Sequence, residues 1–60
     1  MDIKTLRESK NLTQDDVAKA VNSSRSTVAM WEAGKSMPQA DKLPVLANLF
    51  SCSIDDLFVE

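Results

Sequence analysis

Residues 13–34 read TQDDVAKAVNSSRSTVAMWEAG, and this stretch decides the fold that we predict for the chain. Thr13 is a strong candidate for a helix N-cap, because Asp16 stands three residues later and can complete a capping box. Ser24 can cap a second helix that reaches about Ala33, which is followed by the only glycine of the chain. The stretch therefore predicts two consecutive helices with a very short connection.

The connection between these helices consists of Asn22 and Ser23 alone. Two residues are too few for an antiparallel hairpin with long arms, and asparagine is one of the few residues besides glycine that readily adopt the left-handed conformation. Ala18 is small enough for the second helix to cross closely over the first. A tight turn and a small residue at the crossing, with apolar residues on the inner side, indicate a helix-turn-helix.

The second helix opens on four polar residues, Ser24, Arg25, Ser26 and Thr27. Its later residues Val28 and Trp31 are apolar and lie three positions apart, as on the inner face of an amphipathic helix. In a helix-turn-helix the first turn of the second helix points away from the core. These four polar residues at the start of the helix are therefore available for contact with a partner.

Three further helices are expected outside this stretch, and the chain has no alternating strand pattern. The first covers about residues 2–10, with an aspartate as its cap. Another covers about residues 41–50 and holds Pro44 in its first turn, where the missing N–H costs nothing. A fifth helix follows Ser53, with Asp56 placed to complete its cap.

These elements predict an all-α fold, a compact five-helix bundle that forms a single domain over residues 1–60. The expected core consists of Leu6, Val17, Val21, Val28, Trp31, Leu46 and Leu57. No apolar run approaches the roughly 18–20 residues that span a bilayer, and the first residues lack the apolar segment of a signal peptide. We therefore expect a cytoplasmic protein without a membrane partner.

The charge is spread unevenly along the chain. The net charge of −2 and the pI near 4.9 would ordinarily argue against a nucleic-acid partner. However, residues 1–35 carry six basic and five acidic side chains, a net charge of +1, whereas residues 36–60 carry one basic and four acidic ones, a net charge of −3. The acidity belongs mainly to the C-terminal part, which leaves a weakly cationic face open elsewhere.

The sequence lacks the usual signals of an enzyme or a metal site. The chain has no histidine, no glycine-rich phosphate loop and no metal-ligand spacing. The adjacent aspartates at 15–16 and 55–56 diverge on a helix and fall in first turns, where the helix dipole favours negative charge. Cys52 is expected to be a small buried apolar residue. We therefore expect no enzymatic activity, no cofactor and no metal.

Residues 12–38, LTQDDVAKAVNSSRSTVAMWEAGKSMP, resemble the helix-turn-helix family of phage repressors and Cro proteins, also called the xenobiotic-response-element family. Shorter matches, LR in the first helix, LANLF and S-IDDLF, extend the resemblance over nearly the whole chain. The resemblance implies five helices and sequence-specific binding to double-stranded DNA by a transcriptional regulator, usually a repressor. It implies an inverted-repeat operator and a weak homodimer, for which Leu57, Phe58 and Val59 offer an apolar surface.

The resemblance also assigns roles to individual residues. The implied base contacts in the major groove, from a recognition helix at about residues 24–33, are Arg25, Ser26, Ala29 and Met30. The implied contacts to the DNA backbone are Thr13, Gln14, Ser24, Thr27 and Lys35. Arg7 and Glu32 match a pair that forms a partly buried salt bridge between the first and third helices. For Ser24 and Thr27, a purely structural role as helix caps is equally open.

The chemistry of these side chains fits DNA, with one alternative. Arginine can bond the O6 and N7 atoms of guanine, serine can reach a phosphate or a base edge, and alanine or methionine can pack on a thymine methyl group. Ala29 and Met30 nevertheless stand where the family often has polar residues. The alternative is a protein-interaction module of the same fold, similar to an antitoxin or an anti-repressor, because methionine suits adaptable protein contacts.

Overall fold

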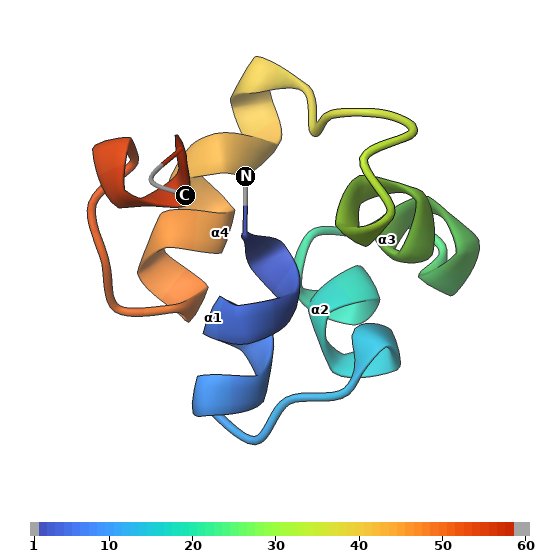
Figure 1. Cartoon of the computed structure of the whole chain (residues 1–60), viewed down its shortest axis with the longest axis horizontal. Coiled ribbons are helices and arrows are strands. Elements are labelled where there is room, and N and C mark those ends of the chain that lie inside the picture. The colour runs from blue at the N-terminus through green and yellow to red at the C-terminus, as the bar shows by residue number, and fades with distance from the viewer. Residues whose placement is uncertain (1, 59–60) are drawn as a thin grey trace.

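The computed structural model of the chain describes residues 2–58. Within these residues it contains four α-helices and two short 3-10 helices, and no strand. The elements are α1 (Ile3–Ser9), α2 (Gln14–Ala20), α3 (Arg25–Glu32), η1 (Ala40–Lys42), α4 (Leu43–Leu49) and η2 (Asp55–Phe58). In Figure 1, α1 lies between α2 and α3 on one side and α4 with η2 on the other. No helix in this part of the chain has the length and apolar character to cross a membrane.

The prediction of five helices is wrong in its last element. The expected cap is present, because the Asp56 N–H donates to Ser53 Oγ and the Ser53 N–H donates to Asp56 Oδ2, each at 3.2 Å. However, the N–H groups of Asp56 and Leu57 bond carbonyls only three residues earlier, so the segment is a 3-10 helix of four residues. Leu57 is fully buried, and a short 3-10 turn is enough to bring it into the core.

The helix expected at residues 41–50 is also divided. The structure has the 3-10 turn η1 at residues 40–42, directly followed by α4, and Pro44 lies in the first turn of α4 as expected. Phe50 is the C-cap of α4 and is buried.

Local side-chain bonds begin the first three α-helices as the sequence predicted. Asp2 accepts a hydrogen bond from the Thr5 N–H, and Ser24 accepts one from the Thr27 N–H. Thr13 begins α2 with a complete capping box. Each of these bonds spans three residues, so each helix start is encoded locally.

All four α-helices of the described chain end in the same way. The residue after each C-cap has a positive φ: 57° for Asn11, 57° for Asn22, 75° for Gly34 and 55° for Ser51. The next N–H then bonds a carbonyl five residues earlier, and the pairs are Leu12–Arg7, Ser23–Ala18, Lys35–Met30 and Cys52–Ala47, with N–O distances of 2.8–3.1 Å. This Schellman motif satisfies the last carbonyls of a helix and reverses the chain abruptly. Four short helices can therefore fold around one core.

The core contains six of the seven predicted residues, since Leu6 is only half-buried. The full set of buried apolar residues is Ile3, Val17, Ala18, Val21, Val28, Trp31, Leu46, Ala47, Phe50 and Leu57. The apolar surface expected near the C-terminus needs correction: Leu57 belongs to the core, Phe58 is 48% exposed, and Val59 lies outside the described residues. Cys52 is half-buried rather than buried, and burial raises the pKa of its thiol.

Candidate nucleic-acid interface

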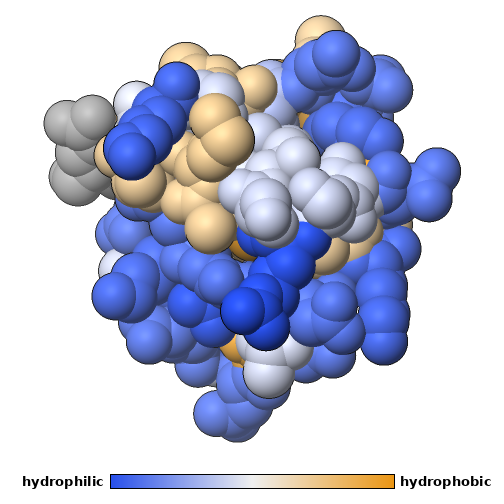
Figure 2. All heavy atoms as spheres, turned by 90° about the vertical axis from the view of Figure 1, so that its right-hand side faces the viewer, coloured by the Kyte–Doolittle hydropathy of each residue, from blue (hydrophilic) through white to orange (hydrophobic). Residues whose placement is uncertain are grey.

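Helix α3 turns one side to the core and the other to solvent. Val28 is fully buried and Trp31 is 6% exposed, whereas Arg25, Ser26 and Met30 are exposed. Figure 2 views the molecule from the side where α3 lies in Figure 1, and there a group of apolar atoms adjoins a hydrophilic area. The exposed side of α3 thus offers both an ionic and an apolar contact.

The residues predicted to read bases are not equally accessible. Arg25 and Ser26 are fully on the surface in the first turn of α3, and Met30 is 45% exposed one turn later. Ala29 is only half-buried, so its methyl group is reachable but recessed. The Arg25 side chain makes no hydrogen bond or ion pair with any other described residue, which leaves its guanidinium available.

The turn between α2 and α3 has the conformation that its sequence favours. Asn22 adopts φ 57°, and the Ser23 N–H bonds the Ala18 carbonyl at 2.8 Å. Ser24 then returns to extended backbone, with φ −87° and ψ 157°, and caps α3. The small side chain of Ala18 is 2% exposed and lies in the core beneath this turn.

Three of the residues predicted to contact the DNA backbone take part in helix caps, two as the N-cap residue and Thr27 as the residue whose N–H is capped. Thr13 Oγ1 accepts from the Asp16 N–H at 3.0 Å, and the Thr13 N–H donates to Asp16 Oδ2 at 2.9 Å. These bonds lower the pKa of the Asp16 carboxyl. Ser24 Oγ accepts from the Thr27 N–H at 3.1 Å and lies 2.9 Å from Thr27 Oγ1. The capping role left open for Ser24 is therefore present, whereas Thr27 lies inside α3 and donates its N–H to that cap.

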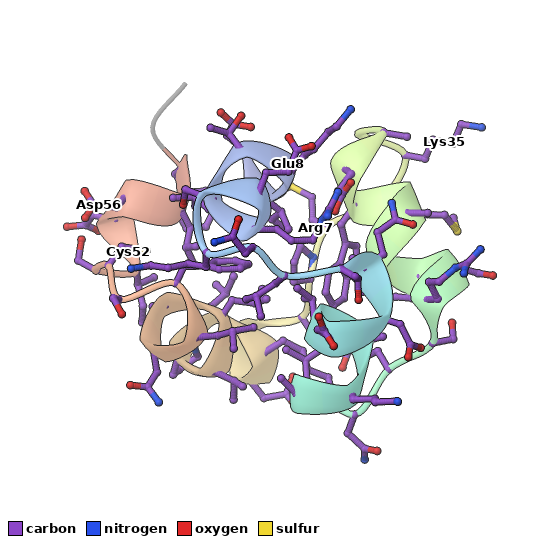
Figure 3. All side chains as sticks on the ribbon, turned by 90° about the horizontal axis from the view of Figure 1, so that it is seen from below. Arg7, Glu8, Lys35, Cys52 and Asp56 are labelled. Carbon is purple, nitrogen blue, oxygen red and sulfur yellow. The ribbon has the colours of Figure 1, made fainter. Side chains whose placement is uncertain are left out.

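The other two of these residues, Gln14 and Lys35, lie near the C-terminal end of α3. Gln14, the first residue of α2, is half-buried, and its Nε2 atom donates to Glu32 Oε1 at 3.1 Å. Lys35 is exposed just beyond the end of α3, and in Figure 3 its side chain extends away from the body of the molecule. One of these groups bonds to α3 itself, and the other can reach only an external partner.

A salt bridge fastens α3 to α1. Arg7 Nε lies 2.8 Å from Glu32 Oε2, and Arg7 Nη2 donates to Glu32 Oε1 at 3.3 Å. Arg7 Nη1 also donates to the Leu12 carbonyl at 2.8 Å. The two charged side chains are 12% and 7% exposed. The position of Arg7 between the helices is visible in Figure 3.

The protonation of this salt bridge is fixed by its surroundings. Burial raises the pKa of the Glu32 carboxyl. The hydrogen bonds from Arg7 and Gln14 together lower this pKa by more than burial raises it, so the net shift is downward. The hydrogen bond to Glu32 raises the pKa of Arg7. Both groups are therefore charged at neutral pH, and α3 is held by a charged pair with directional bonds.

Among the hollows that adjoin α3, two are lined in part by residues that the sequence did not single out. The first lies between the end of α1, the start of α2 and the start of α3, and is lined by Arg7, Asn11, Leu12, Thr13, Gln14, Asp15 and Arg25. The second lies between α3, the segment that follows it and η1, and is lined by Ser23, Thr27, Trp31, Ser36, Met37, Gln39 and Lys42. Asn11 could have been found by its preference for the left-handed conformation. Lys42 carried no signal in the sequence.

Comparison with known proteins decides the family. A helix-turn-helix family model matches residues 3–57, which include all four α-helices, η1 and all but the last residue of η2. The chain belongs to the helix-turn-helix family. The resemblance to phage repressors and Cro proteins noted in the sequence is thereby confirmed, and this helix-turn-helix chain falls in the class of DNA-binding transcription regulators.

The relatives of this helix-turn-helix chain are also named as regulators. It is 38% identical over 55 residues to the HTH-type transcriptional activator BcrR of Enterococcus faecalis. The aligned segment covers 92% of this chain and 27% of the activator. It is 35% identical over 57 residues to an uncharacterized HTH-type transcriptional regulator of Archaeoglobus fulgidus. That alignment covers 95% of this chain and 80% of the relative.

A solved structure has the same arrangement of helices. The crystal structure of a transcriptional regulator from Listeria innocua superposes with a TM-score of 0.86 at 32% sequence identity, covering 97% of this chain and 56% of that one. The helix-turn-helix chain thus spans only about a quarter of the Enterococcus activator and little more than half of the Listeria regulator.

Proposed function

We propose that residues 1–60 form a single domain that binds double-stranded DNA in a sequence-specific way, with α3 as the recognition helix in the major groove. One observation carries this proposal. The outer side of α3 presents Arg25, Ser26 and Met30 to solvent, while the inner side is buried and bonded to two other helices. A helix held in this way enters the groove as a rigid element.

The proposed base contacts follow from the chemistry of the exposed side chains. Arg25 can bond the O6 and N7 atoms of a guanine, and Ser26 can bond a base edge or a neighbouring phosphate. Met30, with Ala29 behind it, offers apolar contact to thymine methyl groups. Base recognition therefore divides into a polar half at the start of α3 and an apolar half one turn later.

The proposed backbone contacts surround α3. Lys35 is an exposed cation just beyond the C-terminal end of α3, and Gln14 has a second amide hydrogen besides the one it donates to Glu32. The hydroxyl groups of the caps Thr13 and Ser24, and that of Thr27 beside Ser24, keep a further lone pair or hydrogen for a phosphate or a bridging water. With so few cations, we expect a shallow dependence of affinity on salt.

We propose that the domain binds an inverted repeat as a weak homodimer. One recognition helix reads only a few base pairs, and two half-sites about one helical turn apart supply the rest. Phe58 is 48% exposed and Ile54 is 41% exposed near the C-terminal end of the described chain. These side chains replace Leu57 as the apolar groups that a second copy can cover.

We propose repression as the regulatory outcome, because a domain bound over a promoter can exclude polymerase by occupancy alone. A promoter–reporter assay with the selected operator placed between the promoter elements tests whether the chain represses or activates transcription. Loss of reporter signal on expression of the chain is expected. A gain in signal, as the name of the Enterococcus relative implies for that protein, contradicts it.

One observation favours the alternative of a protein-interaction module. Met30 and Met37 are 45% and 62% exposed, and methionine adapts to varied protein surfaces. In this alternative, the apolar part of α3 around Met30 contacts another protein, and Arg25 lies at the edge of that interface.

Selection of binding sites from random double-stranded DNA decides between the two functions. The expected result is an enriched inverted repeat that contains a guanine and thymines in each half-site. Binding measured on the selected duplex at rising salt must weaken linearly on a log–log plot, with a slope set by the phosphates contacted. Failure to enrich any sequence, together with salt-independent capture of a protein partner, supports the interaction module.

A further inference from the structure

A lysine from a distant part of the chain bonds the end of α2. Lys42 Nζ donates to the Val21 carbonyl at 2.6 Å, and this bond is partly buried. Lys42 is the last residue of η1 and stands directly before α4, whereas Val21 is the C-cap of α2. The bond therefore joins two segments that are 21 residues apart in sequence.

We propose that Lys42 is a positioning residue for DNA recognition, which holds the C-terminal end of α2 and so fixes the turn that sets the direction of α3. The inference rests on the function proposed above and deepens it. In this proposal, the Lys42 side chain orients the recognition helix without itself contacting DNA.

The Val21 carbonyl receives no hydrogen bond from the helix that it ends. The Schellman motif satisfies the carbonyls of Ala18 and Lys19 with the N–H groups of Ser23 and Asn22. The left-handed φ of Asn22 then turns the chain away, so the helical ladder cannot supply an N–H to Val21. An ammonium group fills this place and also complements the negative end of the helix dipole.

The anchor at the other end of this bond is rigid. Directly after Lys42, α4 contributes Leu46 and Ala47 to the core, and these residues are 0% and 6% exposed. Lys42 also lines the second hollow beside Ser23 and Thr27, which flank the start of α3. The side chain therefore braces the α2–α3 turn against the core.

A direct contact between Lys42 and a phosphate is the competing explanation, and Lys35 provides the contrast. Lys42 is half-buried and its ammonium is held by a carbonyl of the protein, whereas Lys35 is exposed and has no such bond within the described residues. The two lysines flank the same loop, so they form a matched pair for mutation.

The test compares Lys42→Met, Lys42→Arg and Lys35→Met with the parent chain. Affinity is measured for a duplex that the parent has selected from a random library and for a duplex of scrambled sequence, each at several salt concentrations. Amide NMR spectra of the free proteins report the backbone at residues 21–24, and thermal melts establish that each variant is folded at the assay temperature.

The proposal predicts a loss of sequence-specific binding only. Lys42→Met should weaken binding to the selected duplex by roughly tenfold, about the size of one charge-assisted hydrogen bond, with little change on the scrambled duplex and an unchanged salt slope. The amide signals of Asn22 and Ser23 should shift in the free protein. Lys42→Arg should bind nearly like the parent, because its guanidinium can still donate to a carbonyl. Lys35→Met should weaken binding to both duplexes and reduce the salt slope by about one.

Three results overturn the proposal. These are unchanged binding of Lys42→Met to the selected duplex, an equal loss on both duplexes with a smaller salt slope, and a Lys42→Met chain that no longer folds. The second result would make Lys42 a phosphate contact, and the third would make it a residue of stability alone. A parent chain that selects no DNA refutes the proposed function first, and the positioning role falls with it.

Discussion

Arg7 on α1 and Glu32 on α3 form a two-point salt bridge, with N–O distances of 2.8 and 3.3 Å. The Glu32 Oε1 atom that takes the longer bond also accepts a hydrogen bond from Gln14 on α2 at 3.1 Å. One carboxylate thus ties three helices together at the end of α3. This arrangement separates the residues that hold α3 from those that α3 presents to solvent.

Replacing Arg7 with alanine should destabilise the fold. The change leaves the carboxylate of Glu32 largely buried without its cation, at a cost of about 2–3 kcal/mol, near or below the lower end of the range for buried pairs because the site is partly wet. For a domain of this size the melting temperature should fall by roughly 10–20 °C. A melt within a few degrees of the parent would show that the pair contributes little.

Replacing Arg25 with alanine should have the opposite profile. The side chain is exposed and bonds to no other described residue, so the melting temperature should stay near that of the parent. Binding to the selected duplex should weaken by roughly 1–3 kcal/mol, and the preference for guanine at one position should relax. Titrations with duplexes that differ at that position measure both effects. Unfolding of Arg25→Ala, or unchanged binding, would favour the protein-interaction module.

Met30 should be sensitive to a single methyl group of the DNA. If its exposed side chain packs on a thymine, replacing that thymine with uracil should weaken binding while the protein stays unchanged. The same substitution should have no effect on a Met30→Ala variant, which serves as the control. Equal binding to every uracil-substituted duplex would assign Met30 to a protein partner.

Acid should remove the contribution of the salt bridge. The pKa of Glu32 is lower in the folded chain than its ordinary value of 4.5. Its contribution to stability is therefore fully present above that value and is lost as the pH falls through the lower, folded pKa. Urea unfolding at a series of pH values from 7 to 3 should show this decline.

The control for the acid experiment is Glu32→Gln, which should be less stable at pH 7 but decline less steeply below pH 4.5, because it has no such carboxyl to protonate. Asp16, whose pKa is also lowered, should add a similar decline that Asp16→Asn removes without affecting the first. Parallel curves for the parent and Glu32→Gln would contradict the role given to the pair.

The sequence by itself determined the starts of three helices and the turn at the centre of the fold. Thr13, Ser24 and Asp2 cap helices through bonds that span three residues, so the residues next to each cap are enough to predict where the helix begins. The left-handed turns at Asn22 and Gly34 were predictable for the same reason. Ser51 adopts the same conformation at the end of α4, although serine carries no strong preference for it.

Apart from the Arg7–Glu32 salt bridge, which the family resemblance implied, only the tertiary structure decided the contacts between segments far apart in the sequence. The bond from Gln14 to Glu32 spans 18 residues and that from Lys42 to Val21 spans 21, and no periodicity or cap motif indicates either. The burial of Leu57 likewise depends on the packing of η2 against the core, which favours a short 3-10 turn over the fifth helix that its cap suggests. Caps and turns depend on neighbours along the chain, whereas these bonds and the burial of an apolar side chain depend on which distant groups the completed fold brings within reach.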